Sequence, residues 1–173
     1  ARRAFDAGAT ILTHAFNAMP GLHHREPGPI GAATADPRVT LEVIADGVHL
    51  APEVVRIAFA AAPGRIALVT DAMAAAGSAD GDYVLGALAV RVENSVARLA
   101  DDTIAGSTLT QDAALRTAVA AGVALPTAVT ALTATPARAI GRPDLGRLEI
   151  GSPADAVLLD ADLRVRRVWT GRA

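Results

Sequence analysis

The hydrophobic pattern of residues 1–71 predicts a helix end followed by three buried strands, with loops and helices between them. Apolar, β-prone runs cover residues 9–14, 39–45 and 65–70, and apolar side chains recur at helical spacing over residues 52–62. Residues 1–8 are typical of a helix that closes on Gly8, and residues 32–37 suit one helical turn. This alternation of strand and helix implies a parallel sheet or barrel.

The pattern changes after residue 78. Short β segments are expected at residues 83–85, 88–92 and 96–99, with a hairpin turn at residues 93–95. Helices are expected at residues 109–121, 126–132 and 135–141, and Ser107 or Thr108 is the expected N-cap of the first. Two further strands are expected at residues 156–160 and 163–170.

The composition narrows the class of protein. The chain has 173 residues, a net charge of −2 and 51% hydrophobic residues, but only 3% aromatic residues. It has no cysteine for a disulfide or a thiolate metal site, no basic stripe for nucleic acid, and no apolar run near the ~20 residues of a membrane span. These features favour a cytoplasmic enzyme. The start inside a helix, without methionine, predicts a piece of a longer protein.

Polar residues follow each of the three predicted strands. His14 follows the first strand, Asp46 and His49 follow the second, and Asp71 follows the third. Because groups at the carboxyl ends of parallel strands converge on one mouth, we expect one site. A neutral imidazole binds divalent metals well, and a nearby carboxylate can move protons to and from water and a leaving group. The pattern therefore indicates metal-assisted hydrolysis.

Other roles for the same residues stay open. His14 alone is compatible with a structural histidine, Asp71 with a cap, and Asn17 with a local turn. The loop over residues 17–31 contains His23, His24 and Arg25, which suit either solvent or an anion such as phosphate. Residues 104–107 precede a predicted helix, where backbone N–H groups can meet a ligand.

Several segments in the same order resemble the N-acetylglucosamine-6-phosphate deacetylases, a branch of the amidohydrolase superfamily. The segments are residues 13–19 (THAFNAM), 23–28 (HHREPG), 45–49 (ADGVH), 68–73 (LVTDAM) and 105–110 (AGSTLT). Residues 146–160 resemble a looser ending that many amidohydrolases share, dihydroorotase-like relatives included. The first two segments are the most specific to the deacetylases.

The resemblance implies the carboxyl-terminal portion of a distorted (β/α)8 barrel, about strands 6–8, plus part of a small β-sandwich. Residues 1–78 would be barrel units, residues 79–103 and 146–173 sandwich strands, and residues 104–145 helices that pack on the barrel. A whole barrel needs about 250 residues, so the earlier strands would lie outside this sequence.

The resemblance also implies roles for individual residues. His14 would ligate a divalent metal, Zn²⁺ or Fe²⁺, whose other ligands come from the missing amino-terminal half. Asp71 would be the general base and then the acid in the deacetylation of N-acetylglucosamine 6-phosphate. The substrate would be bound by further residues, namely Asn17, Ala18, Arg25, Asp46, His49, Ile104, Ala105, Gly106 and Ser107.

The resemblance implies a homodimer in which Arg25 reaches across the interface, and the charge pattern predicts no nucleic-acid or membrane partner. This chain alone is expected to hold metal weakly and to be inactive. Two alternatives stay open: another amidohydrolase, dihydroorotase- or deaminase-like, and a non-catalytic fragment that binds a sugar phosphate. The histidines and Arg25 of the loop favour a phosphorylated substrate over the cyclic amide or nucleobase of the first alternative.

Overall fold

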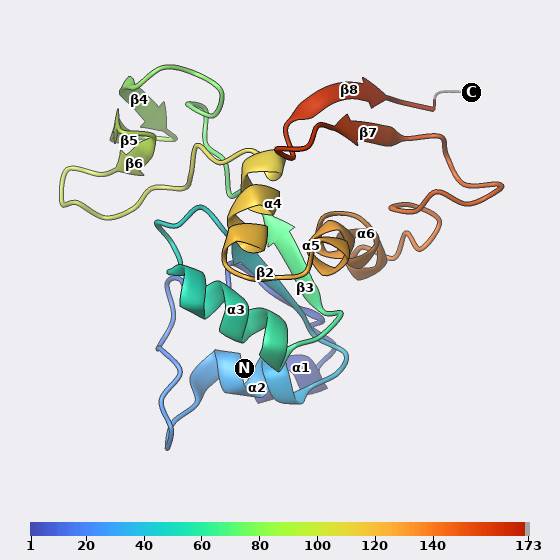
Figure 1. The fold of residues 1–173 in the computed structure, drawn as a ribbon. Coiled ribbons are helices and arrows are strands. Elements are labelled where there is room, and N and C mark those ends of the chain that lie inside the picture. Colours follow the sequence, from blue (N-terminus) through green and yellow to red (C-terminus); the bar gives the residue numbers. More distant parts are fainter. Residues whose placement is uncertain (172–173) are drawn as a thin grey trace.

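A small parallel sheet lies at the centre of the computed structural model, which describes residues 1–171 (Figure 1). Its strands are β1 (Ile11–Leu12), β2 (Thr40–Ile44) and β3 (Ile66–Val69), paired in the order β1-β2-β3. Both pairs are parallel, with Leu12 opposite Leu41 and Ile44 opposite Val69. The predicted parallel arrangement is therefore confirmed, although β1 is shorter than the predicted strand over residues 9–14.

The connections between these strands are helical. α1 (Arg2–Asp6) precedes β1, α2 (Gly28–Ala35) joins β1 to β2, and α3 (Pro52–Ala61) joins β2 to β3. The helical turn predicted at residues 32–37 is wrong in its bounds, because a proline near the start of α2 suits the first turn of a helix and starts it earlier. α3 begins as predicted, but Ile57 points outward and is half exposed.

Three later helices cover the parallel sheet. α4 (Gln111–Ala120), α5 (Leu125–Leu132) and α6 (Ala134–Ala139) all contact β3. Their buried side chains are mostly alanines, which let the helices approach the branched side chains of the strands closely. The predicted N-cap of α4 is wrong: the helix begins after Thr110, and Ser107 bonds elsewhere.

A second sheet is antiparallel and contains β4 (Gly81–Leu85), β5 (Leu88–Glu93) and β6 (Val96–Arg98). The predicted hairpin turn is confirmed, because Asn94 and Ser95 both have positive φ values, 51° and 63°, as a type I′ turn requires. Val90 and Val92 alternate inward and pack in a cluster with Met73. This packing ties the second sheet to the segment that follows β3.

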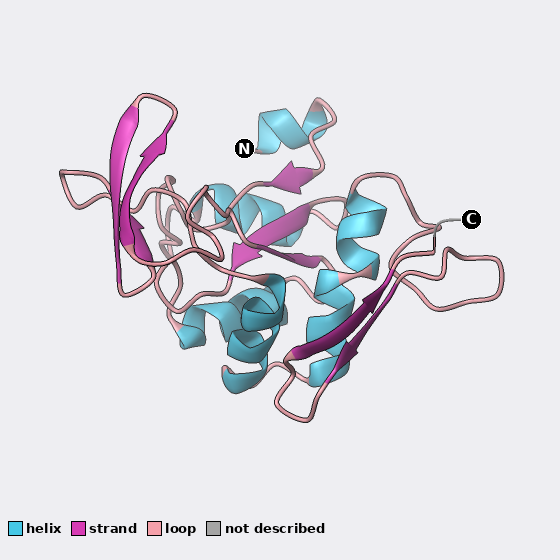
Figure 2. Ribbon diagram, turned by 90° about the horizontal axis from the view of Figure 1, so that it is seen from above, coloured by secondary structure: helices cyan, strands magenta, loops and turns pink. Residues whose placement is uncertain are grey.

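The third sheet is a hairpin of β7 (Ala156–Leu159) and β8 (Val165–Trp169). Figure 2 shows the two antiparallel sheets on opposite sides of the parallel strands. One sandwich built from both therefore stays a prediction, as do the domain boundaries. Among the helices of residues 1–171, none is both long and apolar enough to cross a membrane.

Candidate active site at the strand tips

The parallel sheet brings the predicted polar residues to one edge. His14 follows β1 by two residues, Asp46 follows β2 by two, and Asp71 follows β3 by two. Since the three strands run in the same direction, all three residues lie beyond the same, carboxyl end of the sheet. Within residues 1–171, four of the eight non-glycine residues with positive φ lie at these tips: His14, Phe16, Ala18 and Asp71. Backbone strain of this kind gathers at functional sites.

His14 sits in a tight turn at the end of β1. The backbone N–H of Ala15 donates to the carbonyl of Glu42 at 2.7 Å, so the pairing with β2 continues up to this turn. The side chain of Asn17 closes the turn by donating from Nδ2 to the carbonyls of His14 and Ala15, at 3.3 and 3.2 Å. The Asn17 N–H also donates to the His14 carbonyl, whereas the N–H of Ala18 has no acceptor among the described residues.

Asp46 and His49 form a buried pair after β2. One Asp46 oxygen accepts the backbone N–H groups of Val48 and His49, each at 2.8 Å, and the other lies 2.6 Å from Nδ1 of His49. Burial pushes the pKa of Asp46 up, but the bonds from the ring and the backbone outweigh it and lower the pKa below its usual range. Asp46 is therefore an ionised acceptor whose oxygens are already used inside the protein.

Asp71 differs from Asp46 in its surroundings. It is exposed, and its carboxylate makes no hydrogen bond or ion pair within residues 1–171. Its backbone has φ of 51°, in the left-handed region. An unpaired carboxylate at a strand tip is free to exchange a proton with water or a leaving group.

Residues 104–107 lie beside Asp71. Ala72 and Ser107 form an isolated parallel bridge, and the side chain of Ser107 donates to the carbonyl of Thr70. The predicted loop is thus next to the predicted base. The role of the Thr70 carbonyl was missed, because a backbone acceptor leaves no signal in the sequence.

The loop between β1 and α2 is arranged differently. Figure 1 shows it extending away from the arrowhead of β3. Arg25, His23 and His24 are exposed on it, and the two imidazole rings lie 4.2 Å apart. The side chain of Arg25 makes no hydrogen bond or ion pair with the strand-tip residues within residues 1–171, and the phosphate site expected from Arg25 and His49, with Arg25 reaching across a dimer interface, stays a prediction.

His14 offers one ligand for the expected metal. Its Nδ1 is buried without a hydrogen-bond partner, the only side-chain nitrogen or oxygen in that state among the described residues. An unpaired buried imidazole nitrogen fits a metal ligand, since it otherwise loses a hydrogen bond. Within residues 1–171, however, His, Cys, Asp and Glu side chains form no group of three or more that could hold an ion.

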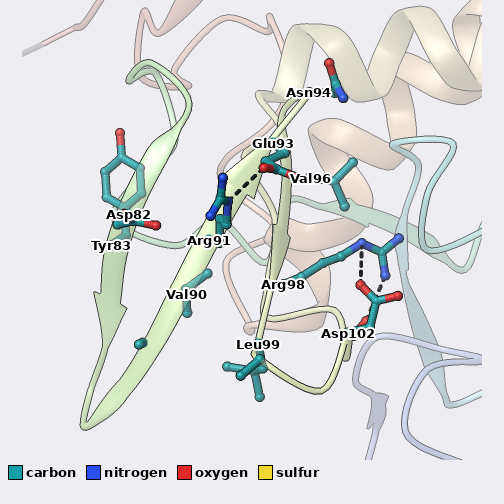
Figure 3. Close-up of a pocket in the computed structure, with 12 residues that line it drawn as sticks. Asp82, Tyr83, Val90, Arg91, Glu93, Asn94, Val96, Arg98, Leu99 and Asp102 are labelled. Carbon is teal, nitrogen blue, oxygen red and sulfur yellow. Dashed lines mark hydrogen bonds and ion pairs between the residues drawn. The ribbon is translucent and has the colours of Figure 1, made fainter.

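A shallow hollow of about 640 Å³ lies elsewhere, on the sheet of β4, β5 and β6 (Figure 3). Arg91 pairs with Glu93 at 2.7 Å, and Arg98 pairs with Asp102 at 3.6 Å. Because the cations are already neutralised by these neighbours, the hollow offers no evident anion site. It lies apart from the strand tips and adds nothing to the expected chemistry.

Comparison with known proteins finds a matching family and similar sequences over nearly the whole chain. The model of the amidohydrolase family matches residues 1–171. An N-acetylgalactosamine-6-phosphate deacetylase of Escherichia coli O157:H7 is 46% identical over 97% of this chain, which covers 45% of that protein. A putative N-acetylgalactosamine-6-phosphate deacetylase of E. coli K12 is 44% identical over 90% of this chain, which covers 95% of that protein.

Solved structures give the same result. An Asp-to-Ala variant of N-acetylglucosamine-6-phosphate deacetylase from Mycobacterium smegmatis, in complex with N-acetylglucosamine 6-phosphate, superimposes with a TM-score of 0.93 at 49% identity. The enzyme from Thermotoga maritima superimposes with a TM-score of 0.92 at 37% identity. This chain spans 46% and 47% of these two proteins, about half of each.

Proposed function

Because this chain belongs to the amidohydrolase family, we propose that it supplies part of the active site of a metal-dependent deacetylase. The reaction is hydrolysis of the acetamido group of N-acetylglucosamine 6-phosphate to glucosamine 6-phosphate and acetate. One observation carries the proposal: an unpaired buried imidazole nitrogen of His14 and a free carboxylate of Asp71 lie beyond the same end of one parallel sheet. The likeness to deacetylases over almost the whole chain supports it.

Two residues perform the proposed chemistry. His14 would hold a divalent ion, Zn²⁺ or Fe²⁺, and the chemistry that such an ion would supply is activation of water and polarisation of the amide carbonyl. Asp71 accepts the proton of the attacking water and later gives it to the departing amine, so that the nitrogen leaves as an amine rather than as an anion. The remaining metal ligands come from outside this sequence, since His14 alone does not make a catalytic metal site.

The phosphorylated sugar is bound by groups around this centre. We place the phosphate near His49 and near the N–H of Ala18, which has no acceptor among the described residues, and the sugar against Ile104 and Ala105. Arg25 lies on the exposed loop. We propose that in a homodimer its guanidinium forms paired hydrogen bonds with the phosphate of the substrate bound in the other copy.

N-acetylgalactosamine 6-phosphate is a second candidate substrate. The two sugar phosphates differ only in the orientation of one hydroxyl, and relatives named for the galactosamine compound are 46% and 44% identical to this chain. Both compounds carry the same acetamido and phosphate groups, so the chemistry above applies to either. An enzyme can distinguish the two sugar phosphates only through its contacts with the hydroxyl whose orientation differs.

The test is a fusion of this chain to the amino-terminal part of the M. smegmatis enzyme, which supplies the half that the chain does not span. We expect the folded, metal-loaded fusion to release acetate from one of the two sugar phosphates. Asp71→Asn should lower kcat by about 1,000-fold or more, since general acid–base catalysis contributes about that much. A folded, metal-loaded fusion without acetate release, or an unchanged kcat in the Asn variant, contradicts the proposal.

A further inference from the structure

We propose that Ser107 is a positioning residue that holds the backbone of Asp71 in its left-handed conformation and thereby aims the carboxylate. This inference rests on the proposed function, in which Asp71 moves the proton. Ser107 is 4% exposed, and its hydroxyl is already bonded to two backbone groups. We therefore assign it no contact with the substrate, in contrast to the role expected from the sequence.

Hydrogen bonds from Ser107 bracket Asp71 on both sides. Its N–H donates to the carbonyl of Asp71 at 2.8 Å, and its carbonyl accepts the N–H of Met73 at 2.9 Å. Its hydroxyl donates to the carbonyl of Thr70 and accepts the N–H of Leu109 at 3.1 Å. The carbonyls before and after the Asp71 nitrogen are thus both fixed by the same residue.

The need for such a clamp follows from the conformation of Asp71. A φ of 51° is less favourable than the usual conformations for a residue with a Cβ, and it persists only where the surroundings enforce it. The Asp71 side chain contributes nothing to this, because it makes no hydrogen bond within the described chain. The enforcing contacts are therefore the hydrogen bonds from Ser107, above all the bond from its hydroxyl to the Thr70 carbonyl, together with the Thr70 hydroxyl, which accepts the N–H of Ala72 at 3.4 Å.

Gly106 makes the close approach of the two segments possible. Its φ is +68°, and a Cβ placed on it would lie 2.9 Å from the carbonyl oxygen of Asp71. A side chain at this position would therefore displace the same carbonyl that Ser107 binds. Gly106 therefore allows the two segments to approach closely, and Ser107 makes the hydrogen bonds between them.

Loss of the Ser107 hydroxyl leaves the part-buried carbonyl of Thr70 and the buried N–H of Leu109 without their partner. The peptide between Thr70 and Asp71 can then rotate toward a more relaxed conformation, which moves the carboxylate. Proton transfer depends steeply on position, and a displacement of about 1 Å can cost about 100-fold in rate. Substrate binding uses other groups, so the effect falls on kcat rather than on KM.

The experiment compares Ser107→Ala with Thr108→Ala in the fusion enzyme. Thr108 is a matched control, because its hydroxyl also donates to a backbone carbonyl, that of Ser95 at 2.6 Å, but does not touch the Asp71 turn. We expect Ser107→Ala to lower kcat about 100-fold with KM changed less than about twofold. Thr108→Ala should keep the kcat of the parent, and Gly106→Ala should resemble Ser107→Ala.

Amide hydrogen exchange of the 173-residue chain gives a second readout that needs no turnover. We expect Ser107→Ala to lose the protection of the Met73 amide, which donates to the Ser107 carbonyl, and Thr108→Ala to keep it. An active parent fusion in which Ser107→Ala and Thr108→Ala have equal kcat overturns the positioning role. An inactive parent contradicts the proposed function instead. Whether or not the parent fusion is active, unchanged protection of the Met73 amide in Ser107→Ala overturns the proposal that Ser107 holds the Asp71 backbone.

Discussion

Replacement of Asp46 by Asn tests the reasoning about the pair after β2. The side chains of Asp46 and His49 are only 11% and 7% exposed, and their polar atoms lie 2.6 Å apart. Asparagine keeps an oxygen for the N–H groups of Val48 and His49, so the turn itself can form. What it loses is the charge, and it presents an NH₂ group to the imidazole Nδ1 where the carboxylate accepted a hydrogen bond.

The expected magnitude follows from burial. A hydrogen bond to a charged group contributes about 1.5–3 kcal/mol, so we expect Asp46→Asn to lower the free energy of unfolding by about 2 kcal/mol at neutral pH. The pKa of Asp46 is lowered in the folded chain, by hydrogen bonds that outweigh the opposing effect of burial. This stabilisation is therefore complete above the unfolded carboxyl pKa of about 4 and is lost as the pH falls through the folded pKa.

The assay is urea unfolding of both proteins at neutral and acidic pH, with Asp36→Asn as the control. Asp36 makes a similar set of bonds, to the N–H and guanidinium of Arg38, but the side chain of this partner is 58% exposed, against 7% for His49. We expect a smaller loss there, because water replaces the lost bonds. Equal losses in the two variants, or an Asp46→Asn loss that is unchanged at about pH 3, would refute the reasoning.

Two further substitutions test how the sheet and its loops are held. Ser95→Gly should raise the free energy of unfolding by about 1 kcal/mol, because Ser95 has φ of 63° in the hairpin turn, where glycine is unstrained; thermal unfolding measures this, and a lower Tm would contradict it. Arg65→Met should lower the free energy of unfolding by about 3 kcal/mol, because the guanidinium donates to the carbonyls of residues 33, 34, 36 and 39 at 2.6–3.0 Å. If chemical denaturation measures a loss in the free energy of unfolding below about 1 kcal/mol, water forms hydrogen bonds with these carbonyls in the variant and the prediction is wrong.

The order of elements could be predicted from local sequence. The strands before His14, Asp46 and Asp71 are continuous apolar runs, and the hairpin at residues 93–95 has turn residues between alternating strands. These signals are local, because each depends on side chains a few residues apart. The bounds of α2 and the N-cap of α4 were less predictable, since neighbouring residues compete for the same position.

The candidate site was predictable in its residue types but not in its contacts. That His14 and Asp71 follow strands could be read along the chain, whereas the separate arrangement of Arg25 depends on the path of an exposed loop. Substrate binding by Asp46 stays a prediction, and the structure adds that both of its oxygens are engaged within its own turn. Whether a carboxylate is free or occupied depends on which donors the fold brings to it.

The sequence by itself determined the family, the parallel order of the strand tips and the two residues suited to metal binding and proton transfer. Only the tertiary structure decided which polar groups are free. Among the described residues it gives the carboxylate of Asp71 no partner, it engages both oxygens of Asp46, and it brings Ser107 from 36 residues further along the chain to the backbone of Asp71. The physical reason is that hydrogen bonds between distant segments depend on backbone geometry, and hydrophobic periodicity records only which face of an element is buried.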